Sequence, residues 1–364
     1  MDFLRLLEGI RSPFLDGLIG IITSLGEETV GIVILCAIFW CISKRVAYKI
    51  GVAYFLSGLT VQGMKICFRI DRPWITDPSF HPVGSAIEHA TGYSFPSGHT
   101  QSATALFGSL GVQIKHKYIK IVCFLLVVLV AFSRMYLGVH TPLDVVASLL
   151  ISMLFVILAA VFMEGGFADL TRAGGGADTK RVAASAGGSD AAGGTGAASA
   201  ADAASAADAT NTTIGASGAD AAGGMSHPLA VNKKREAIIT IFLFAYAVLV
   251  IVIAVVLHSG GTIEESYLTD CLKAAGAGFG FAAGMYIERV YIGFSERTKN
   301  YLFQVIKFVI GFAGVLVIKE GLKLVVGTGL VVDTIRYFLM LMWVTVFFPL
   351  IIKRFFAVKD GGAE

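Results

Sequence analysis

The segment PLDVVASLLISMLFVILAAVFM, residues 142–163, decides the fold. Asp144 is its one charged residue, and as a helix it is long enough to cross the hydrocarbon layer of a membrane. The chain of 364 residues is 55% hydrophobic and 15% charged, with a mean hydropathy of +0.75, and a soluble domain needs more charged surface than this. Similar apolar runs lie near residues 10–25, 28–43, 48–67, 98–114 and 119–137, and again near 236–257, 272–292, 302–319 and 334–352. The sequence therefore predicts an all-α polytopic membrane protein with ten spans.

Residues 165–232 have a different composition, dominated by Ala, Gly, Ser, Asp and Thr. With so few large apolar side chains, this stretch cannot offset the entropy lost on ordering, so we expect a disordered linker. It divides the chain into residues 1–164 with six spans, the linker 165–232, and residues 233–364 with about four further spans. A connection of this length favours two membrane modules over one continuous bundle.

Charge alternates along the predicted spans. Basic clusters at residues 44–49, 115–120, 233–235, 297–299 and 353–354 fall on one side, and the acidic or polar stretches 27–28, 68–97, 264–265 and 333 fall on the other. Because basic loops are typical of the cytoplasmic side, we expect cytoplasmic termini and a cytoplasmic linker in a bacterial plasma membrane. The net charge of +3 is too small to indicate nucleic acid binding.

Three short polar segments border these spans on the predicted extracytoplasmic side. They are Lys65-x6-Arg72-Pro73, Pro96-Ser97-Gly98-His99 and Ser133-Arg134-x5-His140-x3-Asp144. Charged groups at the edge of an apolar span are costly, so they indicate a functional site.

The second segment is typical of a helix start, with Ser97 as N-cap and Gly98 and His99 in the first turn. Free amides at a helix start bind anions, and a glycine lets a phosphate oxygen approach the backbone. A simple capped helix after a loop is the alternative for this tetrapeptide.

The basic residues of the other segments suit phosphate, since Arg supplies a fork of donors and Lys a point charge. Snorkelling toward lipid headgroups is the alternative for Lys65 and Arg72, and it is our expectation for Arg69.

Asp144 follows His140 at a spacing that lets its carboxylate orient the imidazole. One ring nitrogen would then donate to Asp144 and the other would be an unprotonated nucleophile. The alternative is a capping box in which Thr141 is the N-cap, Pro142 the first helical residue and Asp144 the third.

Taken in this order, the three segments resemble the signature of the type 2 phosphatidic acid phosphatase superfamily, with every position filled. Residues 1–163 resemble its six-span membrane form. The resemblance implies a six-helix phosphatase bundle that acts without metal or other cofactor through a phosphohistidine. Its implied substrate is a lipid phosphate or diphosphate in the bilayer, such as phosphatidate, undecaprenyl diphosphate, phosphatidylglycerophosphate or a sphingoid-base phosphate.

The resemblance also implies roles for individual residues. His140 matches the nucleophile, Asp144 the group that orients it, and His99 the general acid. The phosphate-binding groups match Lys65, Arg72, Ser97, Gly98 and Arg134.

A metal site is the competing interpretation of the same residues. His89, His99, His140, Glu88 and Asp144 include the side chains that ligate divalent cations. The neighbouring lysine and arginines argue against it, because they already provide the positive charge that a metal would bring.

The C-terminal spans carry no comparable motif. Gly276, Gly280 and Gly284 recur every four residues, a pattern that lets helices approach closely in lipid. Packing within the chain is our interpretation, with a homodimer contact as the alternative. We also expect Glu288 and Arg289 to form a local ion pair or an interfacial anchor. A lipid transporter or flippase with an ancillary phosphatase half is the alternative function, and a catalytically dead lipid-binding relative is disfavoured because no signature residue is missing.

Overall fold

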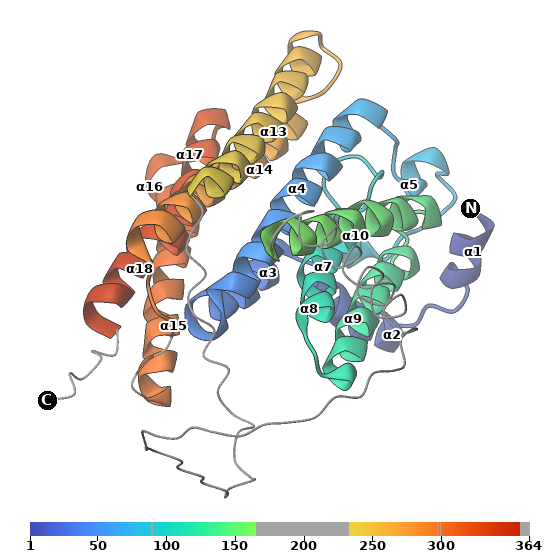
Figure 1. Cartoon of the computed structure of the whole chain (residues 1–364). Helices are drawn as coiled ribbons and strands as arrows, with labels where there is room; N and C mark the ends of the chain where they lie inside the picture. The colour runs from blue at the N-terminus through green and yellow to red at the C-terminus, as the bar shows by residue number, and fades with distance from the viewer. Residues whose placement is uncertain (89, 165–232, 297, 299, 357–364) are drawn as a thin grey trace, which may run out of the picture. The chain divides into compact units, whose positions relative to one another are not determined.

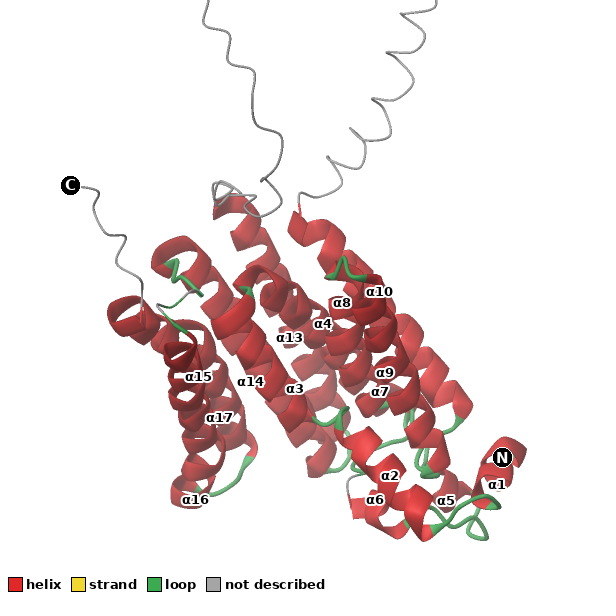
Figure 2. Cartoon of the chain, turned by 90° about the horizontal axis from the view of Figure 1, so that it is seen from below, coloured by secondary structure: helices red, strands yellow, loops and turns green. Residues whose placement is uncertain are grey.

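The computed structural model describes residues 1–88, 90–164, 233–296, 298 and 300–356, and they form helices joined by loops, without a strand in these ranges (Figures 1 and 2). The predicted linker, 165–232, lies outside the described residues. In the first half the helices are α1 (Asp2–Glu8), α2 (Pro13–Ser24), α3 (Glu28–Ala37), α4 (Lys44–Phe68), α5 (Pro73–Thr76), α6 (Gly84–Glu88), α7 (Gly98–Ala103), α8 (Ser109–Gln113), α9 (Lys117–Tyr136) and α10 (Pro142–Glu164). In the second half they are α13 (Lys233–Ser259), α14 (Glu265–Ile287), α15 (Tyr301–Leu316), α16 (Leu322–Val326), α17 (Leu330–Met342) and α18 (Phe348–Ile351).

Short π-helical turns continue several of these helices without a break. They are η1 (Ile38–Ile42), η2 (Thr104–Gly108), η3 (Glu288–Ile292), η4 (Val317–Gly321), η5 (Trp343–Phe347) and η6 (Ile352–Phe356). With them included, a helix covers most of every apolar run that the sequence marks.

By length and composition, six helices in the described ranges can cross a membrane, or seven if the bent pair α2 and α3–η1 counts as one span with its 48° bend. Of the ten predicted spans, 10–25 and 28–43 make up this one bent pair, and 98–114 and 272–292 are absent from the set. The helix over 98–113 is short, and α14 is less apolar than the others. Both helices are largely buried among other helices. Because little of their surface would contact lipid, neither needs a long apolar face.

The two halves of the chain pack on each other. Residues 1–166 and 231–364 form one compact unit, and α14 packs against α4 as well as α13 and α17. The fully buried Trp40 donates from Nε1 to the carbonyl oxygen of Val344 at 3.0 Å, and Phe281 of α14 fills the space beside Gly51 of α4. The expectation of two separate modules is therefore not met, because apolar faces of both halves share one core.

A buried ion pair joins the two halves at the end of α4 opposite Lys65, and a second pair lies beside it within the C-terminal half. Glu288 is fully buried, accepts from Tyr48 Oη at 2.5 Å and pairs with Lys44 at 2.9 Å. Arg289 pairs with Glu236 of α13 at 3.0 Å. The predicted local pair between Glu288 and Arg289 is wrong, because each finds its partner on a neighbouring helix.

The glycine stripe of α14 faces α17 of the same chain. A Cβ atom at Gly276 would lie 2.4 Å from the Thr334 carbonyl oxygen, and one at Gly280 would lie 2.4 Å from the Phe338 carbonyl oxygen. The third glycine, Gly284, lies against the side chain of Thr345 in η5, which continues α17. The stripe is thus occupied within the chain, so it is not a free face for the homodimer considered above.

Candidate active site

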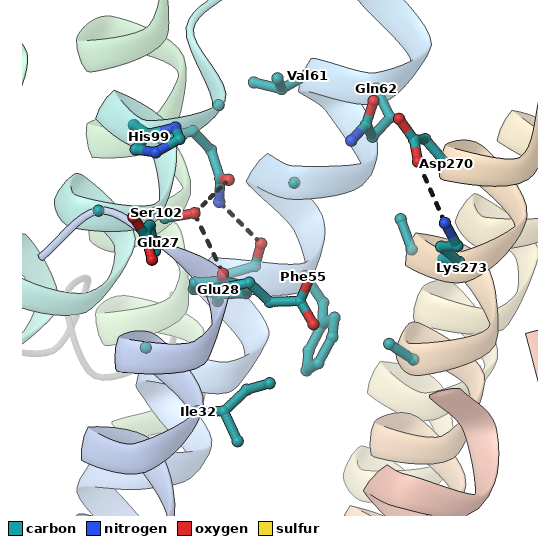
Figure 3. Close-up of a pocket in the computed structure, with 18 of the residues that line it drawn as sticks. Glu27, Glu28, Ile32, Phe55, Val61, Gln62, His99, Ser102, Asp270 and Lys273 are labelled. Atoms are coloured by element: carbon teal, nitrogen blue, oxygen red, sulfur yellow. Dashed lines mark hydrogen bonds and ion pairs between the residues drawn. The ribbon is translucent and has the colours of Figure 1, made fainter. Parts of the chain in front are cut away.

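Residues of all three polar segments meet at one cavity of about 460 Å³. The sequence-predicted residues that line it are Lys65, Arg72, Gly98, His99, Arg134 and His140. Figure 3 shows His99 and Ser102 on one side of this cavity and Asp270 and Lys273 of α14 on the other. Ser97 and Asp144 lie behind the lining.

Arg72 forms hydrogen bonds to two of the loops around the cavity. Its side chain is buried and donates from Nε to the Gly92 carbonyl oxygen at 3.0 Å and from Nη2 to that of Thr91 at 2.7 Å. Nη1 donates to the Val139 carbonyl oxygen at 2.9 Å and lies 3.0 Å from His140 Nε2. Snorkelling is excluded for Arg72, because its head group lies inside the protein.

The contact with Arg72 defines the tautomer of His140. A guanidinium has donors and no acceptor, so Nε2 accepts and the ring proton is on Nδ1. His140 is 2% exposed. Burial, together with Arg72, Arg134 and Lys65, holds the pKa of His140 well below its usual 6.5. The imidazole is therefore neutral, with its Nε2 lone pair directed at the Arg72 guanidinium.

Asp144 fits both interpretations of its sequence position. Its Oδ2 accepts from the Thr141 amide at 2.8 Å, and its own amide donates to Thr141 Oγ1 at 3.3 Å, which completes the capping box. The same Oδ2 accepts from Ser94 Oγ at 2.6 Å and lies 3.5 Å from His140 Nδ1. That last distance is beyond a normal hydrogen bond, but it places the carboxylate against the protonated nitrogen.

The second segment forms a helix start as expected. Ser97 accepts from the Thr100 amide at 3.5 Å and from Thr100 Oγ1 at 3.0 Å, and its carbonyl oxygen accepts from Ser148 Oγ at 2.6 Å. The Ser97 side chain therefore acts as the N-cap, fully buried. A Cβ atom at Gly98 would meet nothing within 4 Å, so the space beside this residue is open.

Two further side chains face the cavity with atoms that bond no described residue. His99 Nε2 is buried without a hydrogen-bond partner in the described ranges. The same is true of Arg134 Nε, whereas Arg134 Nη1 donates to Thr23 Oγ1 of α2 at 2.7 Å. The hairpin of α2 and α3 therefore covers the site, and Gly26 at its turn lies against the His99 backbone.

Three buried cations dominate the electrostatics of the site. Lys65, Arg72 and Arg134 are 9%, 4% and 1% exposed, and within the described ranges none forms an ion pair with a carboxylate. Buried cations are costly unless an anion compensates them. Such an arrangement suits an anion beside the neutral imidazole of His140.

The metal interpretation finds no support in the described part of the chain. No group of three or more His, Cys, Asp or Glu residues is arranged there to hold a metal ion. His89 lies outside the described residues.

Several residues of the site have no sequence signal. Ser94 and Thr91 belong to a loop without a motif, and Thr23 lies inside an ordinary apolar helix. Asp270 and Lys273 lie in the C-terminal half, far along the chain from the three segments. Arg69 is exposed and ends α4 in the left-handed conformation with φ of 50°, where it donates back to the Ile66 carbonyl oxygen at 3.3 Å. Its snorkelling toward headgroups stays a prediction.

Comparison with known proteins gives matches in both halves. Residues 46–166 match the model of the PAP2 superfamily, and residues 272–360 match the model of the PAP2 superfamily phosphatase transmembrane extension. A probable sphingosine-1-phosphate phosphatase of Dictyostelium discoideum is 28% identical over 182 residues, which is 44% of this chain and 42% of the relative. An undecaprenyl-diphosphatase of Bacillus subtilis is 34% identical over 101 residues, or 28% of this chain and 47% of the relative.

The crystal structure of a PAP2-type phosphatidylglycerolphosphate phosphatase from Bacillus subtilis aligns with a TM-score of 0.39 at 24% identity, over 45% of this chain and 83% of that chain. The chain spans less than half the length of either curated relative named above. The two family matches together cover more than half of the chain, and the first contains all three polar segments. The chain belongs to the PAP2 superfamily, that of the type 2 phosphatidic acid phosphatases.

Proposed function

We propose that this protein is an integral-membrane phosphohydrolase that removes phosphate from a lipid phosphate or diphosphate through a phosphohistidine on His140, without a metal. The observation that carries the proposal is the set of three buried cations, Lys65, Arg72 and Arg134, around a neutral His140. The relatives support the substrate class, since their names refer to sphingosine-1-phosphate and to undecaprenyl diphosphate.

In the first step, the phosphate takes over the Arg72 Nη1 donor, and the released Nε2 lone pair of His140 attacks phosphorus while the bond from phosphorus to the lipid oxygen breaks. Before a phosphate binds, burial and Arg134 hold the pKa of His99 well below 6.5, and the negative charge of a bound phosphate favours its protonated form. In that form His99 donates its proton to the leaving oxygen, which departs as the lipid alcohol or, from a diphosphate, as the lipid monophosphate. Asp144 stabilises the positive charge that develops on the imidazole, as the acid does in hydrolase triads.

In the second step, water attacks phosphorus and the bond from phosphorus to nitrogen breaks. His99 accepts a proton from the water, which returns it to its starting state, and inorganic phosphate leaves. Lys65, Arg72, Arg134 and the Gly98 amide neutralise the charge on the phosphoryl oxygens throughout, which is the main task in phosphoryl transfer. Ser97 contributes as the N-cap that holds the Gly98 amide in place.

The charge pattern of the sequence supports an extracytoplasmic site with cytoplasmic termini. Ion pairs gather Lys44, Glu236 and Arg289 at one end of the helices, whereas Glu28, Lys65 and Asp270 line the cavity toward the other. Residues from the predicted cytoplasmic side thus lie at one end of the helices and residues from the predicted extracytoplasmic side at the other, as the charge alternation of the loops requires.

The transporter alternative requires a C-terminal half that moves lipid independently of the phosphatase half. Helices α14 and α17 instead line the same cavity as His140, so we do not propose a separate transport module.

The test is phosphate release by the purified full-length protein in detergent with EDTA. We expect inorganic phosphate from phosphatidate or undecaprenyl diphosphate, and loss of at least about 10³-fold in rate for His140→Ala. His116→Ala is the matched control, because His116 is exposed at the start of α9, and it should keep full activity. Full activity of His140→Ala would refute the proposal.

A further inference from the structure

The cavity extends well past the catalytic residues, between four helices from both halves of the chain. Each helix contributes one face, at the three- and four-residue spacing of a helical stripe. The lining residues that follow this spacing include Glu28, Gly31, Ile32 and Leu35 of α3, then Phe55, Gly58, Gln62 and Lys65 of α4, then Asp270, Lys273, Ala274 and Ala277 of α14, and finally Tyr337, Met340 and Leu341 of α17 with Val344 of η5.

On three of the four helices the lining changes from polar to apolar in the same direction. Glu28, Lys65 and Asp270 lie at the polar end of the cavity. Past Gln62 of α4 and Lys273 of α14, the faces continue with small or apolar residues, which are Ile32 and Leu35, Gly58 and Phe55, and Ala274 and Ala277. On α4 the face from Lys65 to Phe55 covers ten residues, or about 15 Å of helix. A groove thus leads from the phosphate-binding residues into the apolar interior.

The charged residues of the C-terminal half that line this groove already have partners. Lys273 pairs with Asp270 at 3.6 Å and with Asp333 at 3.8 Å. Lys319 pairs with Glu28 at 3.9 Å, and Tyr337 Oη donates to Glu28 at 3.4 Å. These cations are compensated, unlike those around His140, so the phosphate has one place to bind and the groove beyond it suits an uncharged group.

The size of the groove fits one chain. The whole cavity is about 460 Å³, within the range of about 300–1,000 Å³ for small-ligand sites. Figure 3 shows Ile32 and Phe55 beside it, with Asp270 and Lys273 on the opposite helix.

We propose that α14, α17 and η5 form one wall of a groove that holds the apolar chain of the lipid phosphate, so that the C-terminal half selects substrates by their chain. This proposal rests on the proposed function, because the phosphate end of the same molecule lies at His140. The occupant is a single alkyl or prenyl chain. Its burial supplies binding energy in proportion to the apolar area that it covers.

The test narrows the groove in one variant and widens it in another, in each case at the end far from His140. Ala277→Leu narrows it, and Val344→Ala widens it; both residues line the groove and are 6% and 5% exposed. The control is Ala313→Leu, an equal change at an exposed position of α15. The probes are octyl, hexadecyl and methyl-branched phytanyl phosphate in detergent micelles, and the quantity measured is the ratio of kcat/KM values between two probes.

We expect Ala277→Leu to lower the ratio of hexadecyl to octyl phosphate about tenfold, as the loss of two buried methylene groups predicts. We expect Val344→Ala to raise the ratio of phytanyl to hexadecyl phosphate at least about threefold, and Ala313→Leu to change neither ratio.

Ratios that stay within twofold of wild type in both groove variants, while octyl phosphate is still hydrolysed, would overturn the groove and leave the proposed function standing. If Ala277→Leu does not fold, the Val344→Ala ratio decides alone. Failure of the wild type to hydrolyse any of the three probes would contradict the proposed function as well.

Discussion

Arg72 Nη1 lies 3.0 Å from His140 Nε2, and both side chains are buried. The contact joins the first polar segment to the third across 68 residues of sequence. Because the guanidinium can only donate, it selects the tautomer in which the Nε2 lone pair accepts from Arg72 and Nδ1–H faces Asp144. A phosphate bound at this position would contact both the proposed nucleophile, His140, and the positively charged guanidinium of Arg72.

The lowered pKa of His140 makes stability depend on pH with a known sign. Between the lowered folded value and the ordinary 6.5, the unfolded chain binds a proton that the folded chain does not. The protein should therefore lose stability as pH falls below 6.5. When the pH falls from 6.5 by one unit, the free energy of unfolding of the His140→Gln variant should decrease by about 1 kcal/mol less than that of wild type. Thermal unfolding of both proteins in detergent across this range measures it, and parallel curves would contradict the buried neutral imidazole.

Variants of Asp144 and Thr141 distinguish a role in catalysis from a role in helix capping. Asp144→Asn keeps an oxygen for the Thr141 amide and for Ser94 but removes the charge that faces His140, so kcat should fall on the order of 10²-fold or more with little change in unfolding temperature. Thr141→Ala removes the cap oxygen of α10, so it should cost about 0.5–2 kcal/mol of stability and leave kcat within a few-fold. The reverse pattern would mean that Asp144 serves only as a cap.

Gly280 tests the packing of α14 on α17. A Cβ atom there would lie 2.4 Å from the Phe338 carbonyl oxygen, which no side-chain rotation relieves, so Gly280→Ala should cost roughly 1–3 kcal/mol and lower the unfolding temperature. Gly17→Ala on α2 is the control, because a Cβ atom there meets nothing within 4 Å. A Gly280→Ala protein with an unchanged unfolding temperature and a lost dimer would favour the homodimer alternative.

Topology can be measured with single cysteines in a Cys67→Ser background, which removes the exposed native thiol. Ser79 is exposed in the loop between the first two polar segments, and Lys117 is exposed at the start of α9. A membrane-impermeant maleimide should label Ser79→Cys in intact bacterial cells and Lys117→Cys only after lysis. The opposite pattern would place the site in the cytoplasm.

The sequence was sufficient for the helices and for several residues that line the cavity. Long apolar runs predict helices, and Lys65, His99 and His140 stand out because charge and imidazole at the border of a span have few structural uses. Their meeting at one cavity was predicted from the charge alternation, which puts all three segments on one side of the membrane.

Other features depend on tertiary contacts that no local pattern encodes. The Arg72 bonds to the carbonyl oxygens of Thr91 and Gly92 require a particular loop path. Glu288 and Arg289 are neighbours in sequence, but each pairs with a different helix. The long linker suggested independent modules, yet its length restricts neither half, and matching apolar faces bring them together.

The central claim is that His140 carries the phosphoryl group during turnover. The direct measurement uses a lipid phosphate labelled with radioactive phosphorus, an alkaline quench and peptide mapping of the full-length protein in EDTA. The account predicts an acid-labile label on the peptide that contains His140, formed and lost at rates that support turnover, and none in His140→Ala. Steady release of phosphate with no label on that peptide at any quench time would contradict it.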